Sequence, residues 1–248
     1  MEGIVKLNNR IGSKIYSMEI EQPEIANLAR IGTFINLYPK TASLLLPRPF
    51  GISEISKTSI TIVYEVVGKG TLEFSGYKPG DIVKTSRPLG NGFTPCYDNA
   101  THVLVSGGIG IAPLVELAKH LPGKVIAVMG FKDKSFLVGK MQGIGATTYV
   151  ASDSGSEGFK GNVVELLKKE NIIGDYYYGC GPKPMLKAVS EYCEQINRPI
   201  QVSMEGRMGC GYGACVGCSC KVKTADGYTN KKICSDGPVF LGSEIFWE

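Results

Sequence analysis

The chain has 248 residues, of which 43% are hydrophobic and 20% are charged, a composition typical of a folded globular protein and not of a disordered one. Its formal net charge is +4, and the lysines and arginines are scattered along the chain, so we expect no nucleic-acid binding. No apolar run approaches the roughly 20 residues that a membrane span needs, and the first residues lack the pattern of a signal peptide, so we expect a cytoplasmic protein without membrane contact.

The first 98 residues are expected to form a β-domain. β-branched and aromatic residues predominate in four segments, at residues 4–7, 14–20, 34–38 and 59–67. Glycines and prolines between these segments indicate turns, among them Gly12, Pro39, Gly68 and Gly70. Many short strands with frequent turns predict a small antiparallel barrel or sandwich.

Two segments of this β-domain have residue types that suit phosphate binding. Arg48-Pro49-Phe50-Gly51 offers an arginine, which can hold a pyrophosphate through two hydrogen bonds. Gly68-Lys69-Gly70-Thr71 offers backbone N–H groups that can reach phosphate oxygens. Each segment also has an ordinary structural interpretation, since Arg-Pro often starts a strand and Gly-x-Gly-Thr often forms a hairpin.

Residues 99–200 change to an alternation of strands and helices. Apolar segments predict four strands, at residues 102–105, 125–129, 147–151 and 176–178. Asn162 is a candidate N-cap for one of the helices between them. This alternation predicts a doubly wound parallel sheet, the usual framework of a nucleotide-binding domain.

Two glycine-rich turns follow strands of this predicted sheet, and both are expected at its carboxyl edge, where open α/β sheets bind ligands. The turn residues are Gly107, Gly108 and Gly110 in the first and Cys180, Gly181 and Pro182 in the second. The first turn lets backbone approach a pyrophosphate at a helix N-terminus, although its spacing differs from G-x-G-x-x-G. Cys180 is expected either near a nicotinamide or as a small buried residue. The alternative interpretation of both turns is a tight strand-to-helix connection.

Five of the eight cysteines lie between residues 210 and 234. The spacing Cys210-x4-Cys215-x2-Cys218, followed by Cys234, matches the plant-type [2Fe–2S] pattern. Structural zinc more often uses paired short spacings, so zinc and simple packing are the alternatives to a cluster. Cys220 is expected to be a core residue of a strand after the cluster loop.

In this order, the motifs resemble the ferredoxin-reductase superfamily, in which a flavin-binding barrel precedes a nucleotide domain. Residues 205–218 and 234–240 are similar to the electron transfer subunits of type B, NAD-dependent dihydroorotate dehydrogenases, as are residues 88–93 and 153–155. The resemblance implies an FAD-binding β-barrel over residues 1–98, an NAD-binding α/β domain over residues 99–200 and a [2Fe–2S] domain over residues 201–248.

The resemblance also implies which residues hold the cofactors. The FAD contacts are expected at Arg48, Pro49, Phe50, Gly51, Val63, Tyr64, Glu65, Gly70 and Thr71. The four cluster thiolates are expected at Cys210, Cys215, Cys218 and Cys234. Gly51 stands where a serine is common in the family, and Glu65 where an arginine is common. These changes remove a hydrogen-bonding hydroxyl and place an acid where a base is usual.

The implied function is an NAD-linked flavin and iron–sulfur oxidoreductase subunit of pyrimidine biosynthesis. It would relay electrons from the FMN of a catalytic partner through the cluster and FAD to NAD⁺. The implied partner is an FMN-binding dihydroorotate dehydrogenase subunit, with two copies of each chain, and the cluster segment with its tail at residues 244–248 is expected to border that interface. The alternatives are related subunits that couple NAD(P)H to ferredoxin, sulfide or hydrogenase partners, and a zinc-stabilised binding module.

Overall fold

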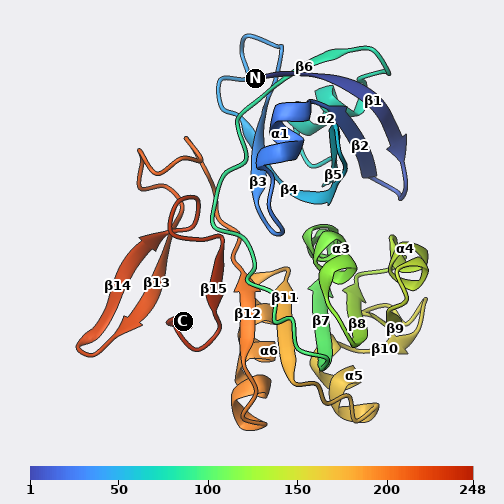
Figure 1. The fold of residues 1–248 in the computed structure, drawn as a ribbon, viewed down its shortest axis with the longest axis vertical. Coiled ribbons are helices and arrows are strands. Elements are labelled where there is room, and N and C mark those ends of the chain that lie inside the picture. Colours follow the sequence, from blue (N-terminus) through green and yellow to red (C-terminus); the bar gives the residue numbers. More distant parts are fainter. Residues whose placement is uncertain (248) are drawn as a thin grey trace.

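The structure, a computed structural model, describes residues 1–247, and its N-terminal part is a closed antiparallel barrel (Figure 1). The strands follow the order β1-β2-β5-β4-β3-β6, and β6 closes the barrel by pairing with β1. Their bounds are Glu2–Arg10 (β1), Ile15–Glu21 (β2), Phe34–Tyr38 (β3), Arg48–Ile55 (β4), Ser59–Glu65 (β5) and Ile82–Thr85 (β6). Met18, Ile20 and Ile62 point inward and are fully buried, each contributing about 1.5–3 kcal/mol. The predicted antiparallel barrel is confirmed.

Two short helices pack onto the barrel core through Ile25 and Phe74, which are both fully buried. They are α1 (Pro23–Leu28) and α2 (Lys69–Ser75). The prediction of a turn at Gly70 was wrong, because α2 begins directly after Gly68 and includes Gly70. The strand expected over residues 59–67 ends earlier, at Glu65, because the following residues lead into α2.

The middle of the chain forms a parallel sheet in the order β10-β9-β8-β7-β11-β12, with β15 added antiparallel to β12. The strands are Thr101–Gly107 (β7), Lys124–Phe131 (β8), Thr147–Ser152 (β9), Phe159–Lys160 (β10), Tyr176–Cys180 (β11), Ile200–Ser203 (β12) and Val239–Leu241 (β15). The helices are Gly108–Gly110 (η1, 3₁₀), Ile111–His120 (α3), Val138–Gly143 (α4), Val163–Lys169 (α5) and Lys183–Gln195 (α6). The Asn162 side chain caps α5 by accepting from the N–H groups of Val164 and Glu165, as predicted.

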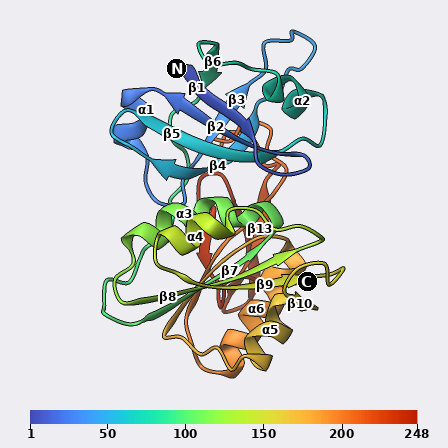
Figure 2. The same cartoon turned by 90° about the vertical axis from the view of Figure 1, so that its right-hand side faces the viewer.

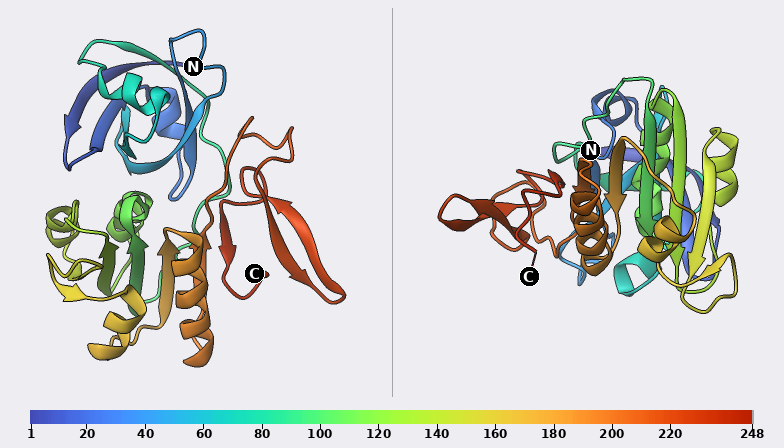
Figure 3. Two further views of the ribbon diagram at one scale, coloured as in Figure 1. Left: turned by 180° about the vertical axis from the view of Figure 1, so that it is seen from behind. Right: turned by 90° about the horizontal axis from the view of Figure 1, so that it is seen from below.

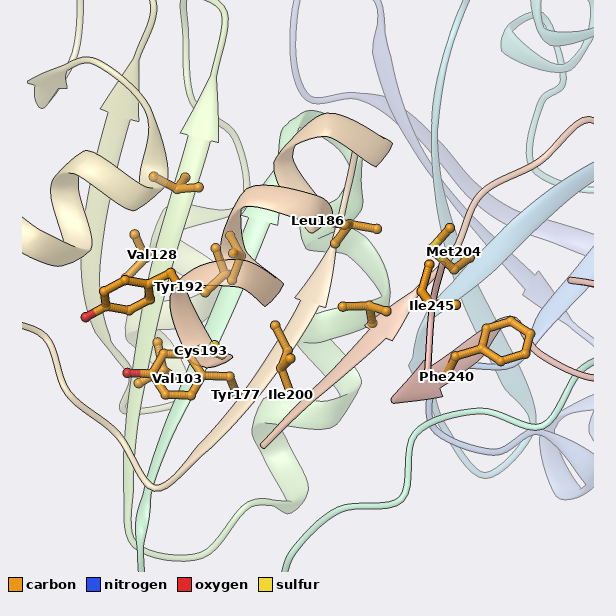
Figure 4. Packing of buried hydrophobic residues seen from close by; sticks show 14 of the residues in the cluster. Val103, Val128, Tyr177, Leu186, Tyr192, Cys193, Ile200, Met204, Phe240 and Ile245 are labelled. Atoms are coloured by element: carbon orange, nitrogen blue, oxygen red, sulfur yellow. The ribbon is translucent and has the colours of Figure 1, made fainter. Parts of the chain in front are cut away.

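Helices cover both faces of this sheet. On the face toward the barrel, α3 packs with Leu104 and Met129, and it lies between the sheet and β4 (Figure 2). On the other face, α5 and α6 pack on Val103 and Val128, with Leu186 fully buried (Figure 4). The sheet is therefore doubly wound, as predicted, and its carboxyl edge opens toward the barrel.

The C-terminal segment leaves the sheet after β12 and returns to it as β15. Between them lie the cysteine loop and a hairpin of β13 (Ser219–Thr224) and β14 (Gly227–Lys232), which projects from the edge of the sheet (Figure 3). Cys220 lies in β13, as expected, but it is half-buried at the border of the core rather than inside it. β15 belongs to the central sheet although it follows residue 200 in the sequence. The expected division of the chain after residues 98 and 200 stays a prediction. Among residues 1–247, no helix is both long and apolar enough to cross a membrane.

Candidate functional site

A first cavity of about 490 Å³ lies between the barrel and the sheet. Its barrel wall comes from β4, β5 and the start of α2, and its opposite wall from η1, α3 and the ends of β11 and β12. This volume falls within the range of small-molecule sites, about 300–1,000 Å³. All the residues that the sequence suggests for FAD line this cavity: Arg48, Pro49, Phe50, Gly51, Val63, Tyr64, Glu65, Gly70 and Thr71.

The side chain of Arg48 lies against the first turn of α2. A Cβ atom at Gly70 would come within 2.6 Å of Arg48 Nε, so glycine is needed for this close approach. Arg48 donates to the carbonyl of Leu46 and takes part in none of the ion pairs found in residues 1–247. An arginine at a cavity without an acidic partner is well suited to bind a pyrophosphate.

An aromatic wall lies next to Arg48. The rings of Phe50 and Tyr64 have centroids 5.4 Å apart, and the Tyr64 hydroxyl donates to Asn8 Oδ1 at 3.0 Å. Burial raises the pKa of Tyr64, so the hydroxyl remains a neutral donor. The two rings are tilted by 48° to each other, so they form an angled apolar wall against which one face of a fused ring system could pack.

Gly51 and Glu65, the positions where the resemblance led us to expect a serine and an arginine, both border the first cavity. A Cβ atom at Gly51 would lie 3.5 Å from Pro113 Cβ, an ordinary contact, so packing does not require glycine there. Glu65 is exposed at the end of β5 and borders the second cavity as well. An acidic group at this point disfavours a phosphate, so a pyrophosphate is expected near Arg48 and Lys69, the two cations that line the first cavity.

The sheet side of the first cavity carries a thiol and a hydroxyl. Cys180 is 3% exposed, and burial raises its pKa, so the thiol stays protonated at neutral pH. Its side chain hydrogen-bonds with Ser203 on the adjacent strand β12. Glu205 follows two residues later and lines both cavities, and desolvation raises the pKa of its carboxyl group.

Sequence patterns do not single out Ser203, and they include Glu205 only as the first residue of the segment 205–218, with no role of its own. The signal that could have found them is their place at the carboxyl end of the short apolar segment at residues 200–203, which forms β12. The end of that strand lies beside the end of β11, which the glycine-rich turn at Cys180 did mark.

The two glycine-rich turns lie against each other. A Cβ atom at Gly110 would overlap the carbonyl oxygen of Cys180, and one at Gly181 would lie 2.8 Å from the Gly107 nitrogen. These glycines are therefore needed for packing between the turns, as the ordinary structural interpretation held. Gly108 differs, because its Cβ position is open space and its φ is +53°.

A second cavity of about 1,420 Å³ follows the carboxyl ends of β7 and β8 and the start of α5. The residues of the two glycine-rich turns are divided between the cavities. The second cavity is lined by Gly107, Gly108 and Pro182, and the first by Gly110 and Cys180. Gly181 packs against Gly107 and lines neither cavity. Ile109, Glu65 and Glu205 border both cavities, so ligands in the two cavities would meet there.

Of the four cysteines expected to bind the cluster, Cys210, Cys215 and Cys218 lie in the loop before β13 and Cys234 follows β14, and the four form two pairs. In the first pair, the backbone N–H of Cys215 donates to Cys210 Sγ at 3.4 Å. The N–H groups of Cys215, Tyr212 and Ala214 lower the pKa of Cys210 to about 6, which favours the thiolate. In the second pair, the side chains of Cys218 and Cys234 hydrogen-bond with each other.

The second pair is more deeply placed. Burial raises the pKa of Cys234 to about 11, while the Gly213 N–H donates to its sulfur at 3.2 Å. Within residues 1–247, no three histidine, cysteine, aspartate or glutamate side chains are close enough together to hold a single metal ion. Two pairs of thiols fit a cluster with two irons better than one tetrahedral zinc ion, which needs four ligands around one point.

Polar contacts from distant parts of the chain hold the cysteine loop. Asn36 Nδ2 on β3 donates to the Cys210 carbonyl at 2.9 Å. Asn91 Nδ2 donates to the carbonyls of Asp236 and Val239 at 3.0 and 3.1 Å. Met208, two residues before Cys210, lines the first cavity. The loop is thus fixed beside that cavity by the barrel and by the segment that follows it.

Known proteins share this organisation. Residues 205–246 match the family model described as the iron-sulfur cluster binding domain of dihydroorotate dehydrogenase B. The dihydroorotate dehydrogenase B (NAD(+)) electron transfer subunit of Caldanaerobacter subterraneus subsp. tengcongensis is 40% identical over 100% of this chain and 98% of its own length. The subunit of the same name from Bacillus caldolyticus is 39% identical over 95% of this chain and 94% of its own length.

Solved structures share the fold. An NADH-dependent reduced ferredoxin-NADP oxidoreductase matches with a TM-score of 0.88 and 28% identity, over 99% of this chain and 90% of that one. The cytochrome b5 reductase domain of Ulva prolifera nitrate reductase matches with a TM-score of 0.63 and 15% identity, over 79% of this chain and 92% of that one. The second likeness supports the barrel-and-sheet architecture alone.

Proposed function

This chain belongs to the family of dihydroorotate dehydrogenase B (NAD(+)) electron transfer subunits, and we propose that it relays electrons between the FMN of a catalytic partner subunit and NAD. It is an NAD-linked flavin and iron–sulfur oxidoreductase subunit of pyrimidine biosynthesis, with FAD, a [2Fe–2S] cluster and NAD as cofactors. The FMN, the copy number of two of each chain and the cytoplasmic location belong to the proposal.

One observation carries the proposal: the three candidate sites are contiguous. The cysteine loop adjoins the first cavity through Met208, and the first cavity meets the second at Ile109 and Glu205. A relay needs its redox groups in such a series, because electrons move efficiently only between neighbouring groups.

The residues of the first cavity fit FAD. Arg48 would hold the pyrophosphate, since it is a cation without an acidic partner. Phe50 and Tyr64 would flank the flavin, with Cys180 and Ser203 on the sheet side. When bound, FAD exchanges a hydride with the nicotinamide and single electrons with the cluster, which joins two-electron to one-electron chemistry. The second cavity, with Gly108 at its open turn, would hold the nicotinamide nucleotide.

The cysteine loop fits the cluster by its chemistry. Cys210 and Cys215 would bind one iron, and Cys218 and Cys234 the other. The N–H groups that point at the sulfur atoms of Cys210 and Cys234 would stabilise negative charge there and tune the reduction potential.

The catalytic partner is inferred to be a separate chain. The barrel, the sheet and the C-terminal segment of residues 1–247 are each accounted for by one of the three sites. An FMN-binding barrel would need eight βα units and about 250 residues of its own. Oxidation of dihydroorotate is therefore assigned to the partner and reduction of NAD⁺ to this chain.

The test is reconstitution. The isolated chain, with about two iron and two acid-labile sulfide per molecule, is expected to pass electrons from NADH to artificial acceptors and to form no orotate. Adding the FMN-containing subunit should give NAD-linked orotate formation. Stoichiometric zinc without sulfide, or orotate formation by the isolated chain, would contradict the proposal.

The likeness to the NADH-dependent reduced ferredoxin-NADP oxidoreductase favours a second candidate, a subunit that couples NAD(P)H to ferredoxin. Rapid reduction of ferredoxin by the isolated chain, together with no binding to any FMN-containing subunit, would favour this second candidate over the first.

A further inference from the structure

Asn36 is a buried amide at the boundary between the barrel and the C-terminal segment. Its neighbours on β3, Ile35 and Leu37, are fully buried in the barrel core. Because side chains alternate along a strand, Asn36 points the other way, out of the barrel. It is nevertheless only 1% exposed, and its Oδ1 is buried without a hydrogen-bond partner in residues 1–247. An unpaired buried polar atom destabilises a fold, so packing alone does not account for an asparagine at this position.

The amide of Asn36 lies against the backbone of the first cysteine in the cluster motif. Its Nδ2 donates to the Cys210 carbonyl at 2.9 Å. A Cβ atom at Gly211 would come within 2.4 Å of Asn36 Nδ2 and 3.0 Å of Asn36 Oδ1, and the φ of Gly211 is +79°. Glycine is therefore needed there, and its absence of a side chain lets the amide pack directly on the peptide that links Cys210 to Gly211.

The barrel holds Asn36 in a fixed orientation. The Asn36 N–H donates to the Ser86 hydroxyl at 2.9 Å, and the Asn36 carbonyl accepts from the Ser86 N–H at 2.9 Å. In the register of β3 with β4, Asn36 lies opposite Pro49. The side chain thus extends from a strand that is held on both sides, and it acts as a fixed donor that determines where the Cys210 carbonyl lies.

The same strand borders the first cavity. Phe34 lies two residues before Asn36, on the same side of β3, and it lines that cavity. Phe34 also belongs to the same buried cluster of side chains as Cys218 and Cys234. β3 lies on the side of the barrel that faces the C-terminal segment (Figure 1). The strand therefore contacts the cavity that we assign to FAD with one side chain and the cysteine loop with another.

The hydrogen bond from Asn36 has a consequence for electron transfer. Donors near a cluster ligand favour the reduced cluster, because reduction adds negative charge. Asn36 Nδ2 draws electron density from the Cys210 carbonyl and places the positive end of the amide at that peptide. Because Asn36 is buried, water screens this effect little. Without the donor, Cys210 would carry more electron density, and reduction of a cluster bound to it would be less favourable.

From these observations we propose that Asn36 is a positioning residue that raises the reduction potential of the cluster by holding the backbone of Cys210. This inference rests on the proposed function, because it takes Cys210 as a cluster ligand from it. What it adds is a residue of the barrel, 174 positions before Cys210 in the sequence, through which the part of the chain assigned to FAD sets the potential of the one-electron carrier.

The test is a redox titration of the full chain with its cofactors, followed through the EPR signal of the reduced cluster. Asn36→Leu removes the donor and keeps a side chain of similar size. Asn91→Leu is the matched control, because Asn91 also anchors the C-terminal segment, but through the carbonyls of Asp236 and Val239 and not through a cysteine. We expect Asn36→Leu to lower the equilibrium constant for reduction at least about threefold, which is ~28 mV for a one-electron couple. Asn91→Leu should leave the potential nearly unchanged.

The outcomes separate this inference from the proposed function. An unchanged or raised potential in Asn36→Leu, or an equal fall in both variants, would overturn the role of Asn36 and leave the proposed function intact. If the unaltered chain holds no iron and acid-labile sulfide, both fail. If it holds the cluster but binds no FMN-containing subunit, the proposed relay fails and the titration still decides the role of Asn36. Should Asn36→Leu not retain the cluster, Asn36→Ala, which removes the amide without adding apolar bulk, is titrated in its place and should show a fall in the same direction.

Discussion

Arg48 is the residue on which we expect binding of the flavin nucleotide to depend most, because its guanidinium lines the first cavity and forms none of the ion pairs found in residues 1–247. Arg48→Ala should weaken FAD retention by roughly 1.5–3 kcal/mol, the loss of a charge-assisted hydrogen bond. FAD retained after gel filtration and dilution measures this. Arg87→Ala is the control, because Arg87 forms an exposed ion pair with Glu24 away from the cavity. If Arg48→Ala keeps its full complement of FAD, the assignment is wrong.

Glu73 on α2 anchors the loop that leads to Arg48. Its carboxylate accepts from the Lys40 N–H at 2.6 Å, the Thr41 N–H at 3.1 Å and the Tyr77 hydroxyl at 2.6 Å. Partial burial opposes the charge, but hydrogen bonds from Thr41 and Tyr77 outweigh it and lower the pKa of Glu73 from 4.5 to about 2.

This shift predicts a pH dependence. Because the folded pKa is below the unfolded one, the ionised Glu73 stabilises the fold fully above pH 4.5, and this contribution is lost as pH falls toward about 2. Glu73→Gln should therefore unfold at lower urea than the unaltered chain at pH 7, and the gap should shrink near pH 3. Glu191→Gln, an exposed site on α6, is the control. A gap that is constant with pH would refute this role.

At the residue scale, the spacing of residues close together in the sequence allowed a site to be predicted, whereas contacts between distant residues could not be predicted. The cysteine pattern predicted one four-thiol site, because three of the thiols lie within nine residues and the fourth follows at the plant-type position. Asn36 and Asn91, which hold that loop, are separated from their partners by 174 and 148 residues. No pattern within a short window indicates such contacts, so these residues become visible only in the folded chain.

At the scale of elements, two glycines in the turn after β7 have different roles. Gly110 is needed for packing against Cys180, and Gly108 borders the second cavity with open space at its Cβ position. Gly108→Val should place a side chain in the second cavity, and its φ of +53° also disfavours valine. NADH-driven flavin reduction should slow by at least about tenfold, or ~1.4 kcal/mol, while chemical reduction of the flavin is unchanged. Gly139→Val is the control, because its Cβ position is also open but lies in α4. Equal slowing of both reductions would point to misfolding instead.

The elements that the sequence predicted are those with strong local signals. β3 spans residues 34–38, as expected from its aromatic and β-branched residues, and α5 begins at its Asn162 cap. β4 was not among the four predicted strands, because it contains Pro49 and Gly51, which disfavour strands, although a strand start at Arg48-Pro49 was the ordinary structural interpretation of that segment. It forms because it pairs with β3 on one side and β5 on the other. α2 was missed for a similar reason, since glycines surround its start.

At the scale of the whole molecule, a charged network joins the barrel to the sheet. Glu116 on α3 is 4% exposed, and its Oε2 accepts from the Ile55 N–H of the barrel at 3.1 Å. Lys119 Nζ contacts Glu116 and Glu54 at 3.0 and 2.9 Å, and Lys140 also binds Glu54. Both cavities lie along the boundary that this network holds.

Removal of this contact should loosen the boundary. Glu116→Ala leaves the Ile55 N–H without its acceptor, so unfolding should become easier by about 1–3 kcal/mol, and NADH-driven flavin reduction should slow as the cavities lose alignment. Urea unfolding and stopped-flow kinetics measure the two effects. Glu116→Gln keeps an acceptor and should lose less, and Glu21→Ala, in an exposed pair with Lys6, should change stability by under about 1 kcal/mol. If Glu116→Ala lowers the free energy of unfolding no more than Glu21→Ala does, the network does not hold the boundary.

The return of the chain to the sheet as β15 has a consequence for how such proteins can diversify. Ser203 and Val239 lie opposite each other on the paired strands β12 and β15, so the residues between them form an excursion whose two ends are already neighbours. The excursion can therefore be shortened, lengthened or exchanged without altering the order of the other sheet strands. The cysteine loop lies within this excursion, so the segment that we assign to the one-electron carrier could vary while the barrel and the order of the sheet strands stay the same.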